Sequence, residues 1–412
     1  MTCSDHFTRQ QDGSSRYEGS KPAFMKPFGL YVHVPFCDGK CHYCAFYSTR
    51  YEADLADRCV AAIEKEFAFR SNGPGRDHGP FDTIYFGGGT PTILSDTQLE
   101  RLCTLATQSR GPTVEWTVEA NPGTVSRSRL ELLKRAGVNR ISLGAQAFDD
   151  DILLKLGRRH TAEDTAVAAA MIREAGFTNL GIDLITCIPG VDIQMWQGTL
   201  DKALALAPQH ISVYALTVEE GTFLSEMTGR GEEEMLDDLT QLELLRLAEE
   251  VLNKAGYGRY EISNYAIPGF ECRHNLACWR GSEYVGLGPS ASSHVGNSRW
   301  TNVRDLAGYL SAIEGNNPPV VEVEALTKVM KATEMVIFGL RMADGINIPF
   351  VRGVSGITSC EEKKLIAVFQ RLLESGVVES RGDDWVLTDR GRDVADTVAV
   401  ELIGWEDGSP VT

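Results

Sequence analysis

Residues 30–44 read LYVHVPFCDGKCHYC, a short apolar run that leads into three closely spaced cysteines. Valine, tyrosine and phenylalanine favour extended backbone, so Leu30–Pro35 is predicted to be a β-strand. Cys37, Cys41 and Cys44 follow it, with three and then two residues between successive thiols. Thiolates are soft ligands, so three of them in one short loop predict an iron–sulfur cluster or a zinc ion.

The number of ligands separates these alternatives. A structural zinc ion takes four protein ligands, whereas this loop supplies three cysteines. His42 is the candidate for a fourth, but it lies between two cysteines and is expected to point away from their common centre. A cluster of four irons held by three thiolates keeps one iron open for another ligand. A disulfide is disfavoured in a large chain without a secretion signal. We therefore favour a 4Fe–4S cluster.

Strand-like and helix-like segments alternate from residue 30 to about residue 218. The six predicted strands are Leu30–Pro35, Thr83–Gly87, Glu115–Ala120, Arg140–Gln146, Leu180–Ile188 and His210–Thr217. The amphipathic helices predicted between them are Ala53–Phe69, Thr97–Gln108, Arg129–Ala136, Glu163–Ala175 and Met195–Leu206. Six such units imply an α/β fold with a parallel sheet, either doubly wound or curled into a partial barrel. In both arrangements ligands bind at the carboxyl ends of the strands.

Polar residues fall late in three of these strands. Glu119, Gln146 and Asp183 lie among apolar neighbours in the third, fourth and fifth strands. Burying a neutral polar group unpaired costs roughly 2–7 kcal/mol, so each needs either a core hydrogen bond or a ligand. Three on successive strands favour a shared polar ligand. Residues 87–91, which read GGGTP after the second strand, are expected to offer backbone N–H groups to the same ligand.

The C-x3-C-x2-C motif after the first of six βα units resembles the radical SAM superfamily. That resemblance implies a (βα)6 partial barrel, a 4Fe–4S cluster on the three cysteines, and S-adenosylmethionine (SAM) bound to the open iron through its amino and carboxylate groups. Reduction of SAM then gives a 5′-deoxyadenosyl radical that abstracts hydrogen. The positions that match SAM-contacting residues are Tyr31, Gly89, Thr90, Glu119, Gln146, Arg158 and Asp183. Tyr43 also flanks the cluster, and Arg159 is the rival of Arg158.

The resemblance continues over residues 28–400 to the group that contains oxygen-independent coproporphyrinogen III dehydrogenase and a haem chaperone. The segments that carry it are HISVYAL at 210–216, EGT at 220–222, YEISNYA at 260–266 and LTDRG at 387–391. The dehydrogenase has a further cysteine two residues after the third cluster ligand. This chain has Phe46 there, which is expected to pack beside the cluster.

Residues 272–279 read CRHNLACW and resemble the H-N-x-x-Y-W motif of the haem chaperone, with Cys278 at the tyrosine position. The resemblance implies haem as a ligand. His274 is the candidate axial ligand, because a neutral imidazole nitrogen binds iron well. A histidine hydrogen-bonded within the fold is the alternative interpretation. Trp279 is expected to pack on a porphyrin face, Cys272 and Cys278 are further candidate iron ligands, and His294 is a weaker candidate for the same cavity.

These features favour a haem chaperone that binds a 4Fe–4S cluster, SAM and haem, and hands the haem to a recipient haemoprotein. The alternative is an oxygen-independent coproporphyrinogen III oxidase that forms protoporphyrinogen IX by radical decarboxylation of two propionates. A third class, a metal-stabilised binding module without redox chemistry, does not explain the polar residues of strands three to five. Reductive chemistry implies an electron donor such as a flavodoxin or ferredoxin.

Bulk properties exclude other classes. A net charge of −17 argues against nucleic acid as a partner, because phosphate binding needs clustered Lys and Arg. No apolar run reaches the roughly 18 residues of a membrane span, although peripheral membrane contact stays open. Residues 1–27 lack the apolar core of a signal peptide and are predicted to be a disordered tail, with Met25 as an alternative start. Five of the ten cysteines are scattered singly, which favours a reducing, cytoplasmic location.

The change of pattern after residue 218 predicts further regions. Residues 28–235 are the predicted barrel core, and 236–320 are an extension that contains the candidate haem segment. The extension begins with a helix at Leu236–Lys254, has short strands at most in 256–300, and ends in a linker at 316–319. Residues 325–400 are a small C-terminal domain, with helices near Thr327–Leu340 and Cys360–Ser375 followed by a hairpin. Helices with a terminal hairpin resemble a winged helix.

Overall fold

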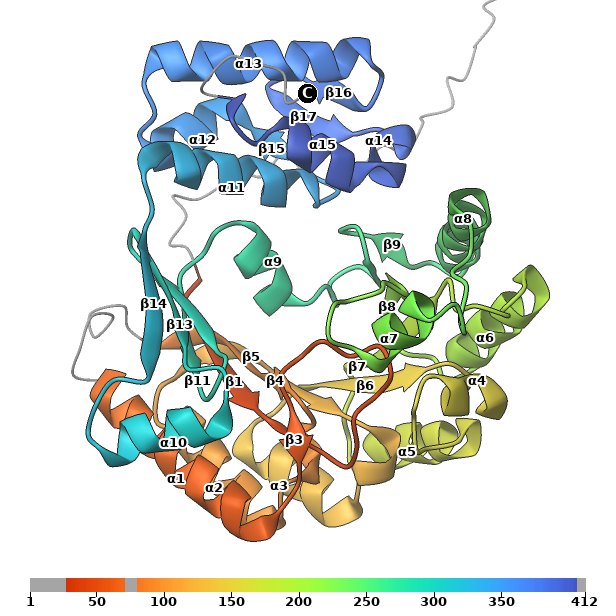
Figure 1. The fold of residues 1–412 in the computed structure, drawn as a ribbon, viewed down its shortest axis with the longest axis vertical. Helices are drawn as coiled ribbons and strands as arrows, with labels where there is room; N and C mark the ends of the chain where they lie inside the picture. Colours follow the sequence, from red (N-terminus) through yellow and green to blue (C-terminus); the bar gives the residue numbers. More distant parts are fainter. Residues whose placement is uncertain (1–26, 71–79, 406–412) are drawn as a thin grey trace, which may run out of the picture.

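The computed structural model describes residues 27–70 and 80–405, so almost all of the predicted tail lies outside the described residues. Its centre is a parallel sheet whose six strands are consecutive in both sequence and space. They are β1 (Gly29–Val34), β4 (Phe81–Gly88), β5 (Arg110–Ala120), β6 (Arg140–Gln146), β7 (Leu180–Thr186) and β8 (His210–Ala215). The sheet curves around a cavity and forms an open barrel (Figure 1). The predicted fold class is confirmed.

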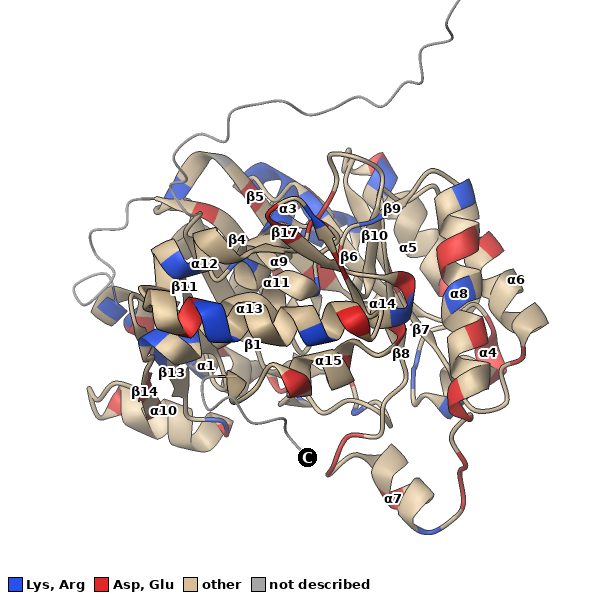
Figure 2. Cartoon of the chain, turned by 90° about the horizontal axis from the view of Figure 1, so that it is seen from above, with Lys and Arg blue, Asp and Glu red and all other residues tan. Residues whose placement is uncertain are grey.

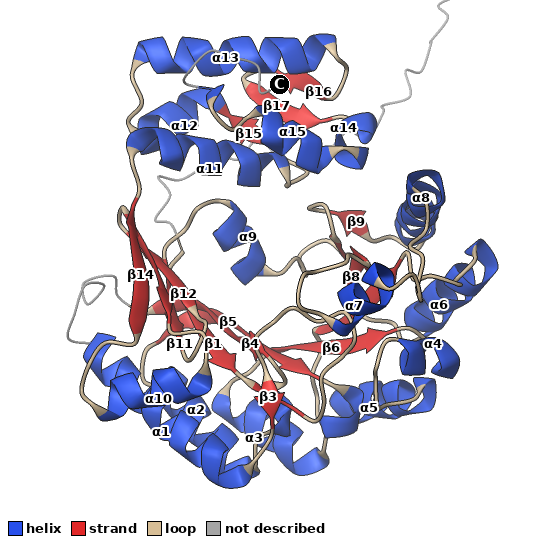
Figure 3. Cartoon of the chain, in the orientation of Figure 1, coloured by secondary structure: helices blue, strands red, loops and turns tan. Residues whose placement is uncertain are grey.

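Helices cover the outer side of this sheet (Figure 3). The main ones are α1 (Ala53–Arg70), α2 (Asp96–Thr107), α3 (Arg127–Ala136), α5 (Ala162–Glu174) and α6 (Ile193–Ala205), each within two residues of its predicted bounds. Shorter elements in the same region are β2 (Phe36–Cys37), β3 (Thr49–Arg50), η2 (Pro91–Ile93), η3 (Pro122–Thr124), α4 (Asp150–Lys155) and α7 (Phe223–Gly229). Because the helices bury the outer faces of the strands, the inward side chains alone meet the cavity.

Residues 238–325 widen the sheet on both sides. On the β8 side they add α8 (Asp238–Lys254), β9 (Gly258–Arg259) and β10 (Asn264–Ala266), with β10 antiparallel to β8. On the β1 side they add β11 (Tyr284–Leu287), β12 (Ser292–Val295), β13 (Ser298–Asn302), α10 (Leu306–Glu314) and β14 (Val320–Ala325). The expected linker at 316–319 is instead the turn between α10 and β14, inside this extension.

A helix stands where short strands at most were expected. Helix α9 (Arg273–Trp279) begins against the carboxylate of Glu115, which accepts hydrogen bonds from the N–H groups of Arg273 and His274 at 3.0 Å each. These donors are among those that a helix start leaves unsatisfied. The capping group comes from β5, more than 150 residues earlier in the chain, so the local sequence carries no helix-start signal.

The C-terminal domain has its own apolar core, in which Val336, Val351, Leu365 and Phe369 are fully buried. Its elements are α11 (Lys328–Leu340), β15 (Ile346–Asn347), α12 (Ile348–Ser355), α13 (Ser359–Glu374), β16 (Val378–Arg381), β17 (Asp384–Leu387), α14 (Asp389–Asp393) and α15 (Ala395–Glu401). Acidic and basic side chains are interspersed along α13 and α8 (Figure 2). Across residues 27–70 and 80–405, no helix combines the length and the apolarity that a membrane crossing requires.

Candidate functional site

The carboxyl ends of the parallel strands surround a cavity of about 650 Å³. The lining includes the three cysteines of the loop after β1 and polar side chains from β4 to β8. Of the eleven residues predicted to bind the cluster or SAM, ten line the cavity and one does not. Ten lie on this cavity: Cys37, Cys41, Tyr43, Cys44, Gly89, Thr90, Glu119, Gln146, Arg158 and Asp183. Tyr31 does not line it, because its hydroxyl bonds His33 Nδ1 at 3.0 Å and its ring lies beside Tyr85.

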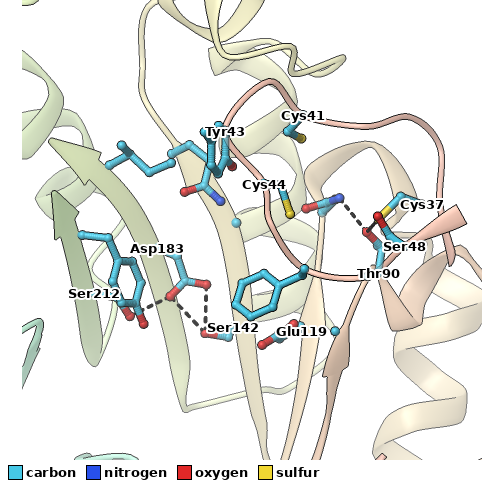
Figure 4. A pocket seen from close by; sticks show the side chains of 18 of the residues that line it. Cys37, Cys41, Tyr43, Cys44, Ser48, Thr90, Glu119, Ser142, Asp183 and Ser212 are labelled. Carbon is cyan, nitrogen blue, oxygen red and sulfur yellow. Dashed lines mark hydrogen bonds between the residues drawn. The ribbon is translucent and has the colours of Figure 1, made fainter. Parts of the chain in front are cut away.

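The cysteine loop presents three half-buried free thiols to one end of the cavity (Figure 4). Cys37 Sγ lies 3.6 Å from Thr90 Oγ1, and Arg158 Nη1 donates to Cys41 Sγ at 3.5 Å. Burial raises the pKa of the Cys37 and Cys44 thiols. Binding iron as thiolates must therefore release protons. Three thiols on one short loop, beside a cavity and a guanidinium, supply the kind of donors that an iron–sulfur cluster takes.

His42 points away from this donor set, as predicted. Its Nδ1 lies 2.8 Å from the carbonyl oxygen of Lys155, and its ring packs on Phe223 with 4.6 Å between centroids. The described part of the chain contains no group of three His, Cys, Asp or Glu side chains arranged around a single metal ion.

The glycine run after β4 packs against the cysteine loop. The N–H groups of Gly89 and Thr90, expected to face a ligand, instead donate to the carbonyls of Val34 and Phe36 at 2.8 and 2.7 Å. A Cβ on Gly89 would lie 2.5 Å from the Phe36 carbonyl oxygen, which explains the need for glycine there. The segment therefore holds the cysteine loop in place, and its close approach leaves the Thr90 side chain on the cavity.

Two half-buried carboxyl groups lie in the middle of the cavity. Glu119 accepts a hydrogen bond from Tyr85 at 2.7 Å, and Asp183 accepts from Ser142 at 3.1 Å and from Ser212 at 2.7 Å (Figure 4). Burial, reinforced by Asp183, raises the pKa of Glu119 to about 7. Burial also raises the pKa of Asp183. Both groups keep capacity to accept further hydrogen bonds from a ligand.

Arg158, and not Arg159, is the arginine of the cavity. Its Nη2 donates to Asn121 Oδ1 and to the Gly144 carbonyl, at 2.8 Å each, while its buried Nε has no hydrogen-bond partner. Asn121 in turn donates to Thr90 at 2.8 Å. Arg159 is exposed. An unused buried guanidinium N–H is a donor available to an anionic ligand.

The sequence prediction missed several polar side chains of the barrel interior. They are Tyr85, Asn121, Arg140, Ser142, His210 and Ser212, all on the cavity. Alternation was the available signal, because residues two apart on a strand share a face. In β6, for example, Gln146 as an inward residue also places Ser142 and Arg140 inward.

The residues of the candidate haem motif do not share one cavity. His274 is 7% exposed, donates or accepts through Nδ1 at 2.9 Å from Thr83 Oγ1, and does not line the large cavity. Burial lowers its pKa to about 4. Asn275 does line the cavity. Cys278 and Trp279 instead line a separate space of about 160 Å³ together with His294. Trp279 packs on the C-terminal domain, between Arg341 at 4.8 Å and Phe338 at 5.7 Å.

Phe46 was expected to pack beside the cluster, but it is 68% exposed on the rim of the cavity. Tyr214, at the end of β8, is also on the rim and 44% exposed. The three cysteines of the preceding loop face the cavity, and the ring of Phe46 faces solvent. We call Phe46 and Tyr214, the two exposed aromatic side chains on the edge of the cavity, the aromatic rim.

Comparison with known proteins defines the class. The family model of the radical SAM superfamily matches residues 31–203, and the HemN C-terminal domain model matches residues 326–394. The solved structure of coproporphyrinogen III oxidase (HemN) from Escherichia coli, described as a radical SAM enzyme, superimposes with a TM-score of 0.80. It covers 92% of this chain and 91% of its own at 22% identity, which shows a common fold.

Full-length relatives define the family. The heme chaperone HemW of Mycobacterium tuberculosis is 35% identical over 94% of this chain and 97% of its own length. HemW of Bacillus subtilis is 31% identical over 91% of this chain and 98% of its own. The chain belongs to the HemW family within the radical SAM superfamily. Membership of that superfamily implies a 4Fe–4S cluster and SAM, which the donor set described above fits.

The cysteine assignment predicts the outcome of replacing one ligand. Cys41→Ser should reduce iron from about four atoms per chain to well below one after anaerobic reconstitution, because two thiolates do not hold a cluster. Iron and sulfide analysis together with the visible charge-transfer absorption measures this. Cys360→Ser, at an exposed thiol of α13, is the matched control and should keep the cluster. Full iron content in Cys41→Ser would refute the assignment.

The raised pKa of Glu119 predicts a pH dependence of stability. A pKa of about 7 in place of 4.5 means that the folded state prefers the protonated carboxyl. This stabilisation is complete below the unfolded pKa and is lost as pH rises through the folded one. Relative to Glu119→Gln, the wild-type apoprotein should lose up to about 3 kcal/mol between about pH 5 and about pH 8. Urea unfolding at both pH values measures it, and an equal difference at the two values would contradict it.

Proposed function

We propose that the chain is a haem chaperone of the cytoplasm, which binds haem and hands it to a recipient haemoprotein. The observation that carries this proposal is the full-length relationship to proteins named heme chaperone HemW, which covers 94% of this chain and 97% of one relative. A match of that extent includes the cysteine loop, the barrel and the CRHNLACW segment together. An electron donor such as a flavodoxin or ferredoxin is part of the proposal.

The aromatic rim supports a large apolar ligand. Phe46 and Tyr214 are 68% and 44% exposed at the edge of the cavity. Exposed apolar groups gathered at a cavity mark surfaces for ligands or partners. A porphyrin has an apolar, flat ring and charged propionates, which matches apolar side chains around a polar interior. Phe46 also occupies the position at which the dehydrogenase carries its additional cysteine.

Different residues of the cavity would bind the cluster and SAM. When bound, the cluster supplies electrons and an open iron. Cys37, Cys41 and Cys44 would hold it, and Arg158 would donate to an anionic group of SAM through its unused Nε. Glu119 and Asp183 would accept hydrogen bonds from hydroxyl or amino groups, and their carboxylates favour the positive sulfonium. In this proposal SAM and the cluster enable or regulate haem transfer.

His274 is the proposed axial haem ligand. Its low pKa keeps the imidazole neutral, as iron ligation requires. Thr83 holds Nδ1, so iron would bind at Nε2. Because the side chain is only 7% exposed, ligation requires α9 to shift away from β4 and β5. The contact of Trp279 with Arg341 and Phe338 would carry such a shift to the C-terminal domain.

The carrier proposal predicts no porphyrinogen turnover. Reconstituted protein should bind haem, and incubation with SAM, reductant and coproporphyrinogen III without oxygen should yield no protoporphyrinogen IX. Liquid chromatography of the porphyrins after oxidation measures the product. Stoichiometric protoporphyrinogen would establish an oxidase and refute the carrier proposal.

Haem ligation by His274 predicts a change in the Soret band. His274→Asn, which can retain a hydrogen bond to Thr83, should shift the band and weaken haem binding about tenfold or more, as loss of one axial ligand implies. His160→Asn is the control, because His160 is also buried with a pKa lowered to about 4. A spectrum unchanged by His274→Asn would exclude His274 as the ligand.

A further inference from the structure

A buried guanidinium lies in the barrel without a matching carboxylate. Arg140, the first residue of β6, is 1% exposed and lines the cavity. Among the described residues, its side chain makes one hydrogen bond, from Nη1 to Thr117 Oγ1 at 3.5 Å. Its buried Nε has no hydrogen-bond partner. A buried cation is strongly destabilising unless an anion or several hydrogen bonds compensate it.

The neighbouring carboxylates are engaged elsewhere. Glu115 accepts from the first N–H groups of α9, Asp183 accepts from Ser142 and Ser212, and Glu119 accepts from Tyr85. None of the three forms an ion pair within 4.0 Å of Arg140 among the described residues. They attract the guanidinium at longer range, but they leave most of its N–H donors unused.

A glycine makes room beside these donors. The register of the sheet places Gly181 opposite Ser142 on one side and opposite His210 on the other. A Cβ on Gly181 would lie 3.1 Å from Arg140 Nη2, 3.3 Å from Ser142 Oγ and 3.4 Å from His210 Nδ1. The three polar atoms therefore surround a single position above Gly181. We call this position the Gly181 niche.

His210 turns a ring nitrogen without a hydrogen-bond partner toward the niche. The N–H of Cys272 donates to the Tyr260 hydroxyl at 3.3 Å, and that hydroxyl lies 2.7 Å from His210 Nε2. The hydroxyl keeps its own proton while it accepts from Cys272, so it is able to donate to Nε2, and in that tautomer Nδ1 carries the ring proton. Burial beside Arg140 lowers the pKa of His210, which favours the neutral ring with a single proton. Nδ1 is buried and has no hydrogen-bond partner.

The niche is therefore rich in donors. Arg140 offers N–H groups, His210 adds Nδ1–H in the tautomer in which Tyr260 donates to Nε2, and the proton of Ser142 is used on Asp183. We propose that the Gly181 niche binds a carboxylate of the ligand that occupies the barrel, and that this carboxylate is a propionate of haem. The second part rests on the proposed function.

Two observations favour haem as the source of the carboxylate. The superfamily binds the SAM carboxylate at the cluster, and the cysteines lie at the other end of the cavity from the start of β6. The niche also adjoins the segment at 272–279, since Cys272 bonds Tyr260 and Asn275 lines the same cavity. A porphyrin edge near α9 would bring a propionate toward Arg140.

The test compares ferric haem with its dimethyl ester, whose propionates carry no charge. Wild-type protein should bind haem about 10- to 100-fold more tightly than the ester, as a charge-assisted hydrogen bond implies. Arg140→Gln should abolish that preference. Gly181→Ala should also reduce it, because the methyl group takes up the niche 3.1 Å from Arg140 Nη2 while the guanidinium itself is retained. The φ of Gly181 is not positive, so alanine is compatible with the backbone there. Arg127→Gln, at an exposed arginine of α3, is the matched control.

A second probe does not depend on haem. Sodium propionate at tens of millimolar should raise the melting temperature of the wild type by about 1–2 °C over equal sodium chloride, and should not do so in either niche variant. If both Arg140→Gln and Gly181→Ala still bind haem more tightly than the dimethyl ester, the propionate assignment is wrong, and the proposal that the protein binds haem is unaffected. Wild type that binds no haem refutes the proposed function, and propionate protection then still decides whether the niche takes a carboxylate. Absence of that protection overturns the niche itself.

Discussion

Burial of polar side chains inside a parallel barrel is the constraint on which the rest of this structure depends. The outer faces of the strands are covered by helices, so every inward polar group must find a partner across the cavity or in a ligand. Asp183 finds Ser142 and Ser212, and Glu119 finds Tyr85. These pairs hold adjacent strands at a fixed register while leaving acceptor capacity toward the cavity. The site is thus formed by the same side chains that stabilise the interior.

The sequence was sufficient for the barrel because its signals are local. Apolar strands, amphipathic helices and the cysteine spacing each occupy a few consecutive residues, and the structure reproduces the helices within two residues. Glu119, Gln146 and Asp183 were predicted because a polar residue in an apolar run is conspicuous. Arg140 and His210 were missed because they begin their strands, where a polar residue looks like a turn.

Features that depend on contacts between distant segments could not be predicted from local sequence. Helix α9 depends on Glu115, a capping carboxylate from a distant strand, so no consecutive stretch predicts it. The exposure of Phe46 is set by which loop residues turn inward, and the cysteines take those positions. The surroundings of His274 could not be inferred either, because Thr83 and Glu115 meet it only once β4 and β5 are paired. Each of these outcomes is decided by tertiary contact.

Charged groups of the barrel interior lie at different depths, with Arg158 beside the cysteines, Glu119 and Asp183 in the middle, and Arg140 at the start of β6. Toward the cysteines, Glu119 and Asp183 make the cavity favourable for a cationic ligand, and SAM carries a positive sulfonium. Toward the start of β6 and β8, Arg140 and His210 present donors that favour an anion. The two ends of the cavity therefore offer different groups to a ligand. On the proposed function, occupancy by SAM would then change the field at the niche through Asp183 and Ser142, which couples the two ligands by electrostatics alone.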